Sequence, residues 1–194
     1  MVNYNPRRIM GLWKSGYALD QHTLSSTMIG HDEFGHPRFE TTRSEVGELL
    51  YKLKYSGDIG CVGGIVDAIT SHLDRWKPDV QVLVPVPPSS ARSVQPVILI
   101  AKEVCRRTGI ILCECVSRKR DETQLKDVFD MDERLRRLEG LFGVDPPMVS
   151  GRGVLLFDDL YRSGATMSAI AEELATAGAS SVYALAVTRT RSNQ

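Results

Sequence analysis

Apolar positions follow helical spacing early in the chain. Residues 46–53 carry Val or Leu at positions 46, 49, 50 and 53, which predicts an amphipathic helix ended by Ser56-Gly57. From Ile59 to Leu73 the same step recurs over four turns, and Pro78 prevents its continuation. The pattern therefore predicts two consecutive helices.

After Pro78 the spacing changes to short apolar runs that alternate with helical segments. The runs VQVLVPVP (80–87), IILCECV (110–116), GVLLFDD (153–159) and SVYALAV (181–187) read as buried strands. Helical spacing over 94–105 and 167–174 separates them, with stops at Gly109 and Gly178. This order predicts an α/β fold: a Rossmann-like parallel sheet with helices on both faces and ligands at the carboxyl ends of the strands, in the loops after residues 87, 116 and 158.

The N-terminal part is patterned differently. Residues 15–43 show loose alternation around the turn-like HDEFGHP (31–37), which predicts two antiparallel strands or a ragged hairpin. We expect residues 1–43 to form a hairpin or hood segment and residues 44–194 a compact core. Histidine and acidic residues at 31–33 read as a solvated hairpin rather than a metal site.

Composition then narrows the class of protein. With 194 residues, 42% hydrophobic and 25% charged, and no long apolar run, the chain suits one globular domain and argues against a membrane span. Nothing reads as an export signal, so we expect a cytoplasmic protein. Basic and acidic residues balance at 24 each, so no global field attracts nucleic acid. Without a CxxC pair, the four cysteines read as thiols rather than zinc ligands.

The segment VLLFDDLYRSGAT (154–166) carries the strongest chemical signal. Asp158 and Asp159 follow a buried strand, where adjacent carboxylates repel unless a cationic or hydroxylated group neutralises them. A small turn then opens a helix, and its backbone N–H groups, hydroxyls and dipole suit a phosphate; it consists of Arg162, Ser163, Gly164, Ala165 and Thr166. A sugar phosphate satisfies both halves. The alternative is a solvated strand end beside a plain helix cap.

This segment resembles the phosphoribosyl pyrophosphate (PRPP) motif of type I phosphoribosyltransferases. Tyr161 and Arg162 depart from that motif, which usually has an aliphatic and a small residue there. Three further segments are similar to the ComF- and GntX-like branch: LVPVPPSSARSVQP (83–96), SRKRDETQL (117–125) and RLRRLEGLF (134–142). The resemblance covers roughly residues 45–190. No cysteine precedes Cys61, so the zinc finger that many members carry is not implied.

The resemblance implies an enzyme that transfers phosphoribosyl from PRPP to a nitrogen acceptor and releases pyrophosphate. Asp158 and Asp159 would hold the ribose, and the turn at 162–166 the 5′-phosphate. The pyrophosphate loop would be Ser89, Ser90, Ala91 and Arg92, and a lid would include Arg118, Lys119 and Gln124. Mg²⁺ would be held mainly by substrate oxygens, with help from Asp158 and Asp159. Trp13, Tyr17 and His22 would belong to a hood over the second substrate, or pack the hairpin onto the sheet.

Two other functions stay open at this point. One is a non-catalytic PRPP- or nucleotide-binding accessory protein of the ComF type, linked to DNA uptake or processing. The other is single-strand DNA binding through Arg118, Lys119 and Arg120, against which the seven basic and seven acidic residues of 117–139 argue. The acceptor is not legible in the sequence, and a homodimer or a protein partner is left open.

Overall fold

A six-stranded sheet forms the centre of the computed structural model, which describes every residue except 1, 89–94, 120–137, 139 and 191–194. The strand order is β1-β2-β10-β9-β5-β6, with β1 antiparallel and the others parallel. The bounds are Arg7–Arg8 (β1), Ser15–Gln21 (β2), Val82–Pro85 (β5), Ile111–Leu112 (β6), Gly153–Tyr161 (β9) and Ser181–Arg189 (β10). The predicted α/β fold with a mainly parallel sheet is confirmed.

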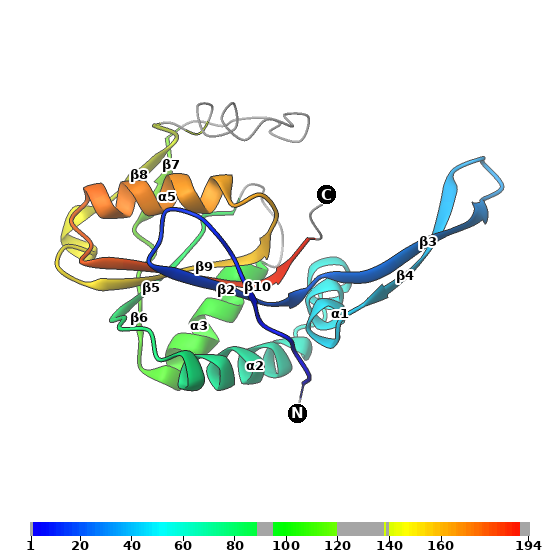
Figure 1. Ribbon diagram of the computed structural model, residues 1–194, viewed down its shortest axis with the longest axis horizontal. Helices are drawn as coiled ribbons and strands as arrows, with labels where there is room; N and C mark the ends of the chain where they lie inside the picture. The colour runs from blue at the N-terminus through cyan, green and yellow to red at the C-terminus, as the bar shows by residue number, and fades with distance from the viewer. Residues whose placement is uncertain (1, 89–94, 120–137, 139, 191–194) are drawn as a thin grey trace.

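Helices cover both faces of this sheet (Figure 1). Val154 and Leu156 of β9 pack in the cluster that includes α5 (Ala165–Thr176), whereas Leu155 and Phe157 pack in the cluster with α1 (Glu45–Tyr51), α2 (Cys61–Trp76) and α3 (Pro96–Thr108). Successive residues of a strand point to opposite faces, so one apolar run supplies two cores.

The predicted pair of early helices is confirmed. α1 continues without a break into a π-helical turn, η1 (Lys52–Ser56), which ends at Gly57 in the left-handed conformation with φ 66°. α2 follows and ends at Trp76, before Pro78. Within the described part of the chain, we find no helix of the length and apolarity that a membrane crossing requires.

The N-terminal pattern is resolved into two different structures. Residues 15–43 were predicted to form two antiparallel strands or a ragged hairpin. This is wrong for β2, which pairs in parallel with β10 from Tyr183↔Ser15 to Arg189↔Gln21. Its apolar Ala18 and Leu19 are fully buried, one in each core, so β2 is a genuine strand of the main sheet. The sequence pattern did not indicate this strand, because its short apolar stretch is flanked by polar residues.

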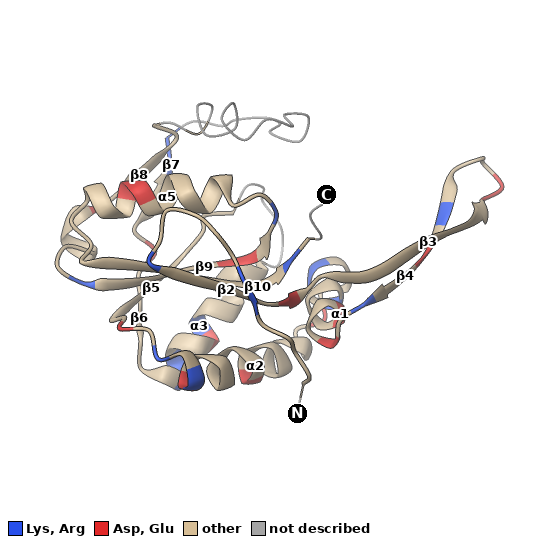
Figure 2. Cartoon of the chain, viewed as in Figure 1, with Lys and Arg blue, Asp and Glu red and all other residues tan. Residues whose placement is uncertain are grey.

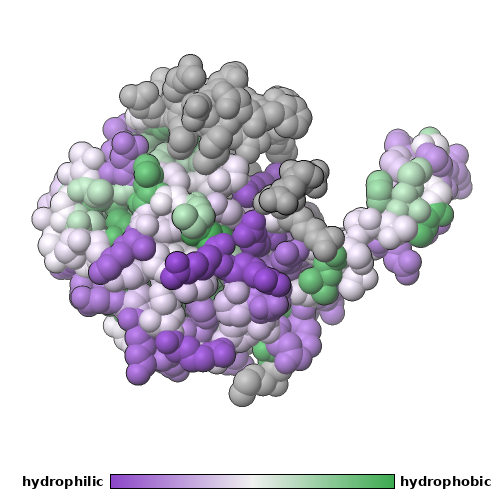
Figure 3. All heavy atoms as spheres, in the orientation of Figure 1, coloured by the Kyte–Doolittle hydropathy of each residue, from purple (hydrophilic) through white to green (hydrophobic). Residues whose placement is uncertain are grey.

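The predicted hairpin exists beyond β2. Strands β3 (Thr23–His31) and β4 (Pro37–Arg43) pair antiparallel around the turn at 32–36, and together we call them the arm. The arm stands clear of the body (Figures 1 and 3). Large apolar side chains are exposed along it: Leu24, Met28, Ile29, Phe34 and Phe39.

The run IILCECV was predicted to be one buried strand, and this is only partly right. Ile111–Leu112 (β6) pairs with β5, and Cys113 is buried, but Glu114 is exposed. The chain then turns away as β7 (Val116–Arg118), which pairs with β8 (Phe142–Val144) in a separate two-stranded sheet. β6 already ends at Leu112, at the edge of the sheet, and its Ile111 is exposed, so a two-residue edge strand takes the place of the predicted buried strand.

Gly153 sits where β9 begins and where the backbone of Asp79 approaches closely. A Cβ at Gly153 would collide with the Asp79 carbonyl oxygen, and that backbone has no free rotamer to move away. We expect Gly153→Ala to lower the free energy of unfolding by about 1–3 kcal/mol. Gly63→Ala in α2, where nothing lies within 4 Å of the added carbon, should raise it by about 0.5–1 kcal/mol. Urea unfolding followed by circular dichroism measures both, and equal stability of the two variants would contradict the expectation.

Candidate functional site

The carboxyl end of β9 carries the two aspartates inside the strand, because β9 runs to Tyr161 rather than ending at 159 as predicted. Asp159 follows Leu155 and Phe157 in the alternation, toward the α1–α3 face. Asp158 follows Leu156, toward the α5 face. Both carboxylates are only partly exposed. The strand therefore presents one acid to each side of the sheet end.

Lys54 neutralises Asp159. Its Nζ lies 2.8 Å from Asp159 Oδ1, and the two side chains are only 14% and 13% exposed. Lys54 belongs to the π-helical turn η1, a kind of irregularity that is frequent at functional sites. Figure 2 shows acidic and basic positions gathering where β9, β10 and the turns after α1 meet. The cation that two adjacent carboxylates require is thus supplied by the chain itself.

The pKa of Asp158 is shifted by its surroundings. Burial, and then the negative charge of Asp159, raise the pKa of Asp158 to about 7. A hydrogen bond donated by the Asp159 backbone N–H to Asp158 Oδ1, at 2.8 Å, opposes the rise without cancelling it. Near neutral pH, Asp158 can therefore exchange a proton or receive a hydroxyl or a cation in its place.

The predicted phosphate turn lies directly after β9. Arg162 is exposed, Ser163 is partly buried, and Gly164 takes the left-handed conformation with φ 81° as the residue before α5. Ala165 and Thr166 form the first turn of α5, where backbone N–H groups lack partners within the helix. The structure thus brings all five residues together at the N-terminal end of a 12-residue helix.

Tyr161 packs against this turn. Its hydroxyl donates to the Met10 carbonyl oxygen at 2.8 Å, and its ring meets Trp13 edge-on with centroids 6.4 Å apart. A Cβ on Gly164 would lie 2.7 Å from the Tyr161 ring, so ring and turn are in close contact. The unusual aromatic residue therefore fixes the turn and ties it to the N-terminal segment. Trp13 packs against Tyr161, and its place in a hood over the second substrate stays a prediction.

His22 lies at the same edge of the sheet as the aspartates, two strands from Asp159, because β2 is parallel. It follows Gln21 at the carboxyl end of β2, and its backbone N–H donates to Arg189 O of β10 at 2.8 Å. Its Nδ1 lies 3.1 Å from Thr188 Oγ1, and that hydroxyl lies 3.5 Å from the Asp159 carbonyl oxygen. The predicted hood residues thus separate: Tyr17 packs on Trp76, while His22 faces the site.

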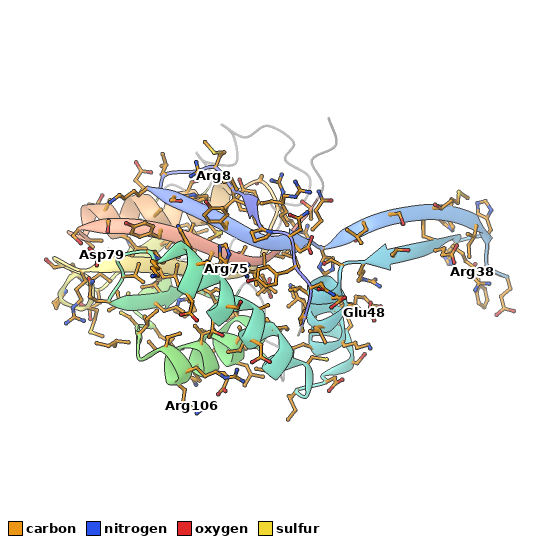
Figure 4. The ribbon with its side chains drawn as sticks, turned by 60° about the horizontal axis from the view of Figure 1, so that its bottom comes forward. Arg8, Arg38, Glu48, Arg75, Asp79 and Arg106 are labelled. Atoms are coloured by element: carbon orange, nitrogen blue, oxygen red, sulfur yellow. The ribbon has the colours of Figure 1, made fainter. Side chains whose placement is uncertain are left out.

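A second charged cluster stands at the root of the arm. Arg43, the last residue of β4, stacks its guanidinium 3.7 Å from the centroid of the Tyr51 ring, and its Nη1 lies 3.5 Å from Glu48 Oε2. Figure 4 shows Glu48 on α1, beside this root. The arm is therefore fastened to α1 close to Lys54.

The remaining predicted residues divide into two groups. Ser89, Ser90, Ala91, Arg92 and Gln124 lie outside the described residues. Arg118 is the last residue of β7 and lies over the Phe142 ring of β8. Lys119 follows β7, and its backbone N–H donates to Leu141 O, just before β8, at 2.8 Å. No hydrogen bond or ion pair joins these two to residues 158–166 in the described part of the chain, so their predicted lid role stays a prediction.

Over the residues that the structure describes, no three His, Cys, Asp or Glu side chains come together as a metal site. Within the described ranges, the donor set at the end of β9 is one carboxylate paired with Lys54 and one, Asp158, for which no ion pair is found. Such a set fits a Mg²⁺ ion that keeps waters and is held chiefly by substrate phosphates. It does not fit a dedicated cation cage.

Sequence reasoning missed three residues of this site. Lys54 lies in the segment YKLKYSGD, where its alternation with apolar residues on a helix gave no sign of burial. Thr188 comes directly after the predicted strand at 181–187, and one threonine at that place gives no sign of a functional role. His22 was placed in a hood, because the parallel pairing of β2 has no local signal. The one usable sign of Lys54 was that two adjacent aspartates at the end of a strand require a cationic partner.

The solved structures that are similar to this chain have low sequence identity and TM-scores below 0.5. No family model matches the chain. Among solved structures, adenine phosphoribosyltransferase from Thermoanaerobacter pseudethanolicus is 12% identical with a TM-score of 0.46, covering 85% of this chain and 94% of that one. A purine phosphoribosyltransferase from Pyrococcus horikoshii is 17% identical with a TM-score of 0.42, covering 67% and 82%.

The allosteric regulatory enzyme of purine biosynthesis is 16% identical with a TM-score of 0.45, and the chain spans 27% of its length. The match covers 76% of this chain. Likeness at these TM-scores carries no argument, so the fold and the site rest on the residues described above.

The contact between Gly164 and Tyr161 can be separated from backbone strain. We expect Gly164→Ala to lower the free energy of unfolding by about 2–4 kcal/mol, since left-handed strain and ring overlap add. Gly151→Ala has a similar φ of 72° but nothing within 4 Å of the new carbon, so it should cost only about 1–2 kcal/mol. Urea unfolding of both variants measures the difference, and equal losses would show that Tyr161 does not support the turn.

Asp158 should make stability depend on pH. Between its ordinary pKa of 3.8 and about 7, the folded protein holds a proton that the unfolded chain has lost, so the free energy of unfolding falls as pH rises through this range. Asp158→Asn should therefore stabilise the protein at pH 8 by on the order of 2 kcal/mol and have little effect near pH 4. Thermal unfolding at both pH values tests this, and an equal effect at both would contradict the assignment.

Proposed function

We propose that this protein is a PRPP-dependent phosphoribosyltransferase, which transfers the phosphoribosyl group to a nitrogen acceptor and releases pyrophosphate. The observation that carries the proposal is the juxtaposition at the end of β9: a half-buried acidic pair is followed, five residues after Asp159, by a left-handed glycine that opens α5. Acidic groups suit the ribose hydroxyls, and the helix N-terminus suits the 5′-phosphate.

The chemistry needs positioning and charge more than a nucleophile. Breaking the bond between C1′ and the pyrophosphate oxygen builds positive charge on the ribose ring, as in glycoside cleavage. Asp159 and Asp158 would lie on the side of the ring where that charge develops, and fixed charges in a dry site stabilise it without reorganisation. Ser89 to Arg92 would bind the leaving pyrophosphate. Bound Mg²⁺ would supply charge neutralisation on the phosphates, with Asp158 as the available protein ligand.

Lys54 gives the site a feature of its own. A ribose diol that binds Asp159 must share that carboxylate with Lys54, because the pair is already formed at 2.8 Å. This favours, as a second candidate, a ComF-type accessory protein that binds PRPP or a nucleotide without turnover. In either case the ligand is a ribose phosphate, so one binding measurement covers both.

Pyrophosphate release separates the two candidates. We expect the protein to release pyrophosphate when incubated with PRPP, Mg²⁺ and a panel of nucleobases. Asp159→Asn should lower that rate at least about 100-fold, because the charge that stabilises the ring is removed. The matched control is Asp74→Asn, at an exposed position of α2, which should keep the rate. Binding of PRPP by calorimetry without release under any base would support the accessory protein, and no binding would reject both.

A further inference from the structure

A chain of hydrogen bonds leads from the end of β9 to the ring of His22. The Thr188 side chain is fully buried between β9 and β2, and its hydroxyl lies 3.5 Å from the Asp159 carbonyl oxygen. The same hydroxyl lies 3.1 Å from His22 Nδ1. Since a carbonyl oxygen only accepts, the hydroxyl proton points to Asp159 and its lone pair to the ring.

This arrangement selects one form of the imidazole. Nδ1 must carry the proton to donate to Thr188 Oγ1, so Nε2, on the far edge of the ring, carries a lone pair. Among the residues that the structure describes, no further hydrogen bond of this ring is found. His22 is half-buried, so Nε2 stays within reach of a ligand.

The backbone around His22 is held firmly. Its N–H donates to Arg189 O at 2.8 Å, and Ser44 Oγ donates to the preceding carbonyl of Gln21 at 2.6 Å. Gly47 of α1 packs directly on the His22 carbonyl, where a side chain would not fit. Sheet, arm root and α1 therefore fix the ring at the carboxyl edge of β2, two strands from Asp159.

Four charged groups face the ring from the elements around it. Lys54 of η1, Arg43 of β4 and Arg162 after β9 disfavour its protonation, and Asp159 of β9 favours it. Burial, which is the largest cause, and the three cations lower the pKa of His22 below its ordinary 6.5, and Asp159 only partly opposes them. The ring is neutral at physiological pH and releases a captured proton readily.

We propose that His22 is the general base of the phosphoribosyl transfer, accepting the acceptor's N–H proton on Nε2. The proposal rests on the proposed function. The acceptor nitrogen forms its bond to C1′, the bond from C1′ to pyrophosphate breaks with its electron pair leaving on oxygen, and the N–H proton passes to Nε2. The imidazolium then returns the proton to water. The proposal applies to an acceptor whose nitrogen is the N–H of a heterocycle, because that nitrogen must lose its proton. It does not apply to a free amine.

The test compares His22→Asn with His31→Asn, an exposed histidine of the arm. Single-turnover pyrophosphate release is measured at saturating PRPP and Mg²⁺ with adenine, hypoxanthine, uracil and orotate in turn. We expect His22→Asn to slow release at least about 100-fold, which is the usual contribution of a general base, with the PRPP dissociation constant changed less than about twofold. His31→Asn should match the wild type.

The pH profile distinguishes a base from a packing residue. In the wild type the rate should fall on the acid side as His22 protonates, and this limb should vanish in His22→Asn, with partial recovery on adding imidazole. An undiminished rate, or a retained acid limb, in His22→Asn would overturn the role of His22 while leaving the transfer intact. If the wild type releases no pyrophosphate with any nucleobase, the proposed transfer is overturned, and the general-base role of His22 is overturned with it.

Discussion

The ion pair between Lys54 and Asp159 is the constraint on which the site depends. It joins the turn after α1 to the end of β9, with both side chains almost buried. Leaving either charge there without its partner would cost several kcal/mol, so the pair sets where η1 rests on the sheet. It also distinguishes the two adjacent aspartates, because Asp159 is paired with Lys54, whereas burial and the negative charge of Asp159 raise the pKa of Asp158.

The parallel pairing of β2 is the second determinant. Since the carboxyl ends of parallel strands lie at one edge, adding β2 beside β10 delivers His22 to the edge that already holds Asp159 and Thr188. An antiparallel β2 would have placed the same histidine at the opposite edge. The strand direction, rather than the spacing of residues along the chain, thus decides which side chains meet.

Much of the fold was legible in the sequence, and much of the site was not. The runs around Val82, Leu155 and Leu185 are apolar on both faces, so their strands and the α/β class follow from the pattern alone. The motif at 158–166 was legible because its chemistry is contiguous. Lys54 and His22 reach the site through tertiary packing, and no local periodicity reports that a lysine will be buried against a distant carboxylate. β2 was misjudged for the same reason, since register and direction are set by its neighbour β10.

The arm has a consequence for how this fold can vary. The chain leaves the body after His22 and returns at Arg43, and the pair Thr23↔Arg43 stands side by side at the root. Everything beyond that pair is an insertion whose two ends meet, so its length can change without shifting the register of the central sheet or the position of α1. Related chains with a longer, shorter or missing excursion at this point would keep the same sheet edge with Asp159, Thr188 and His22, although the arm, the part of the molecule most free to diverge, is anchored beside it.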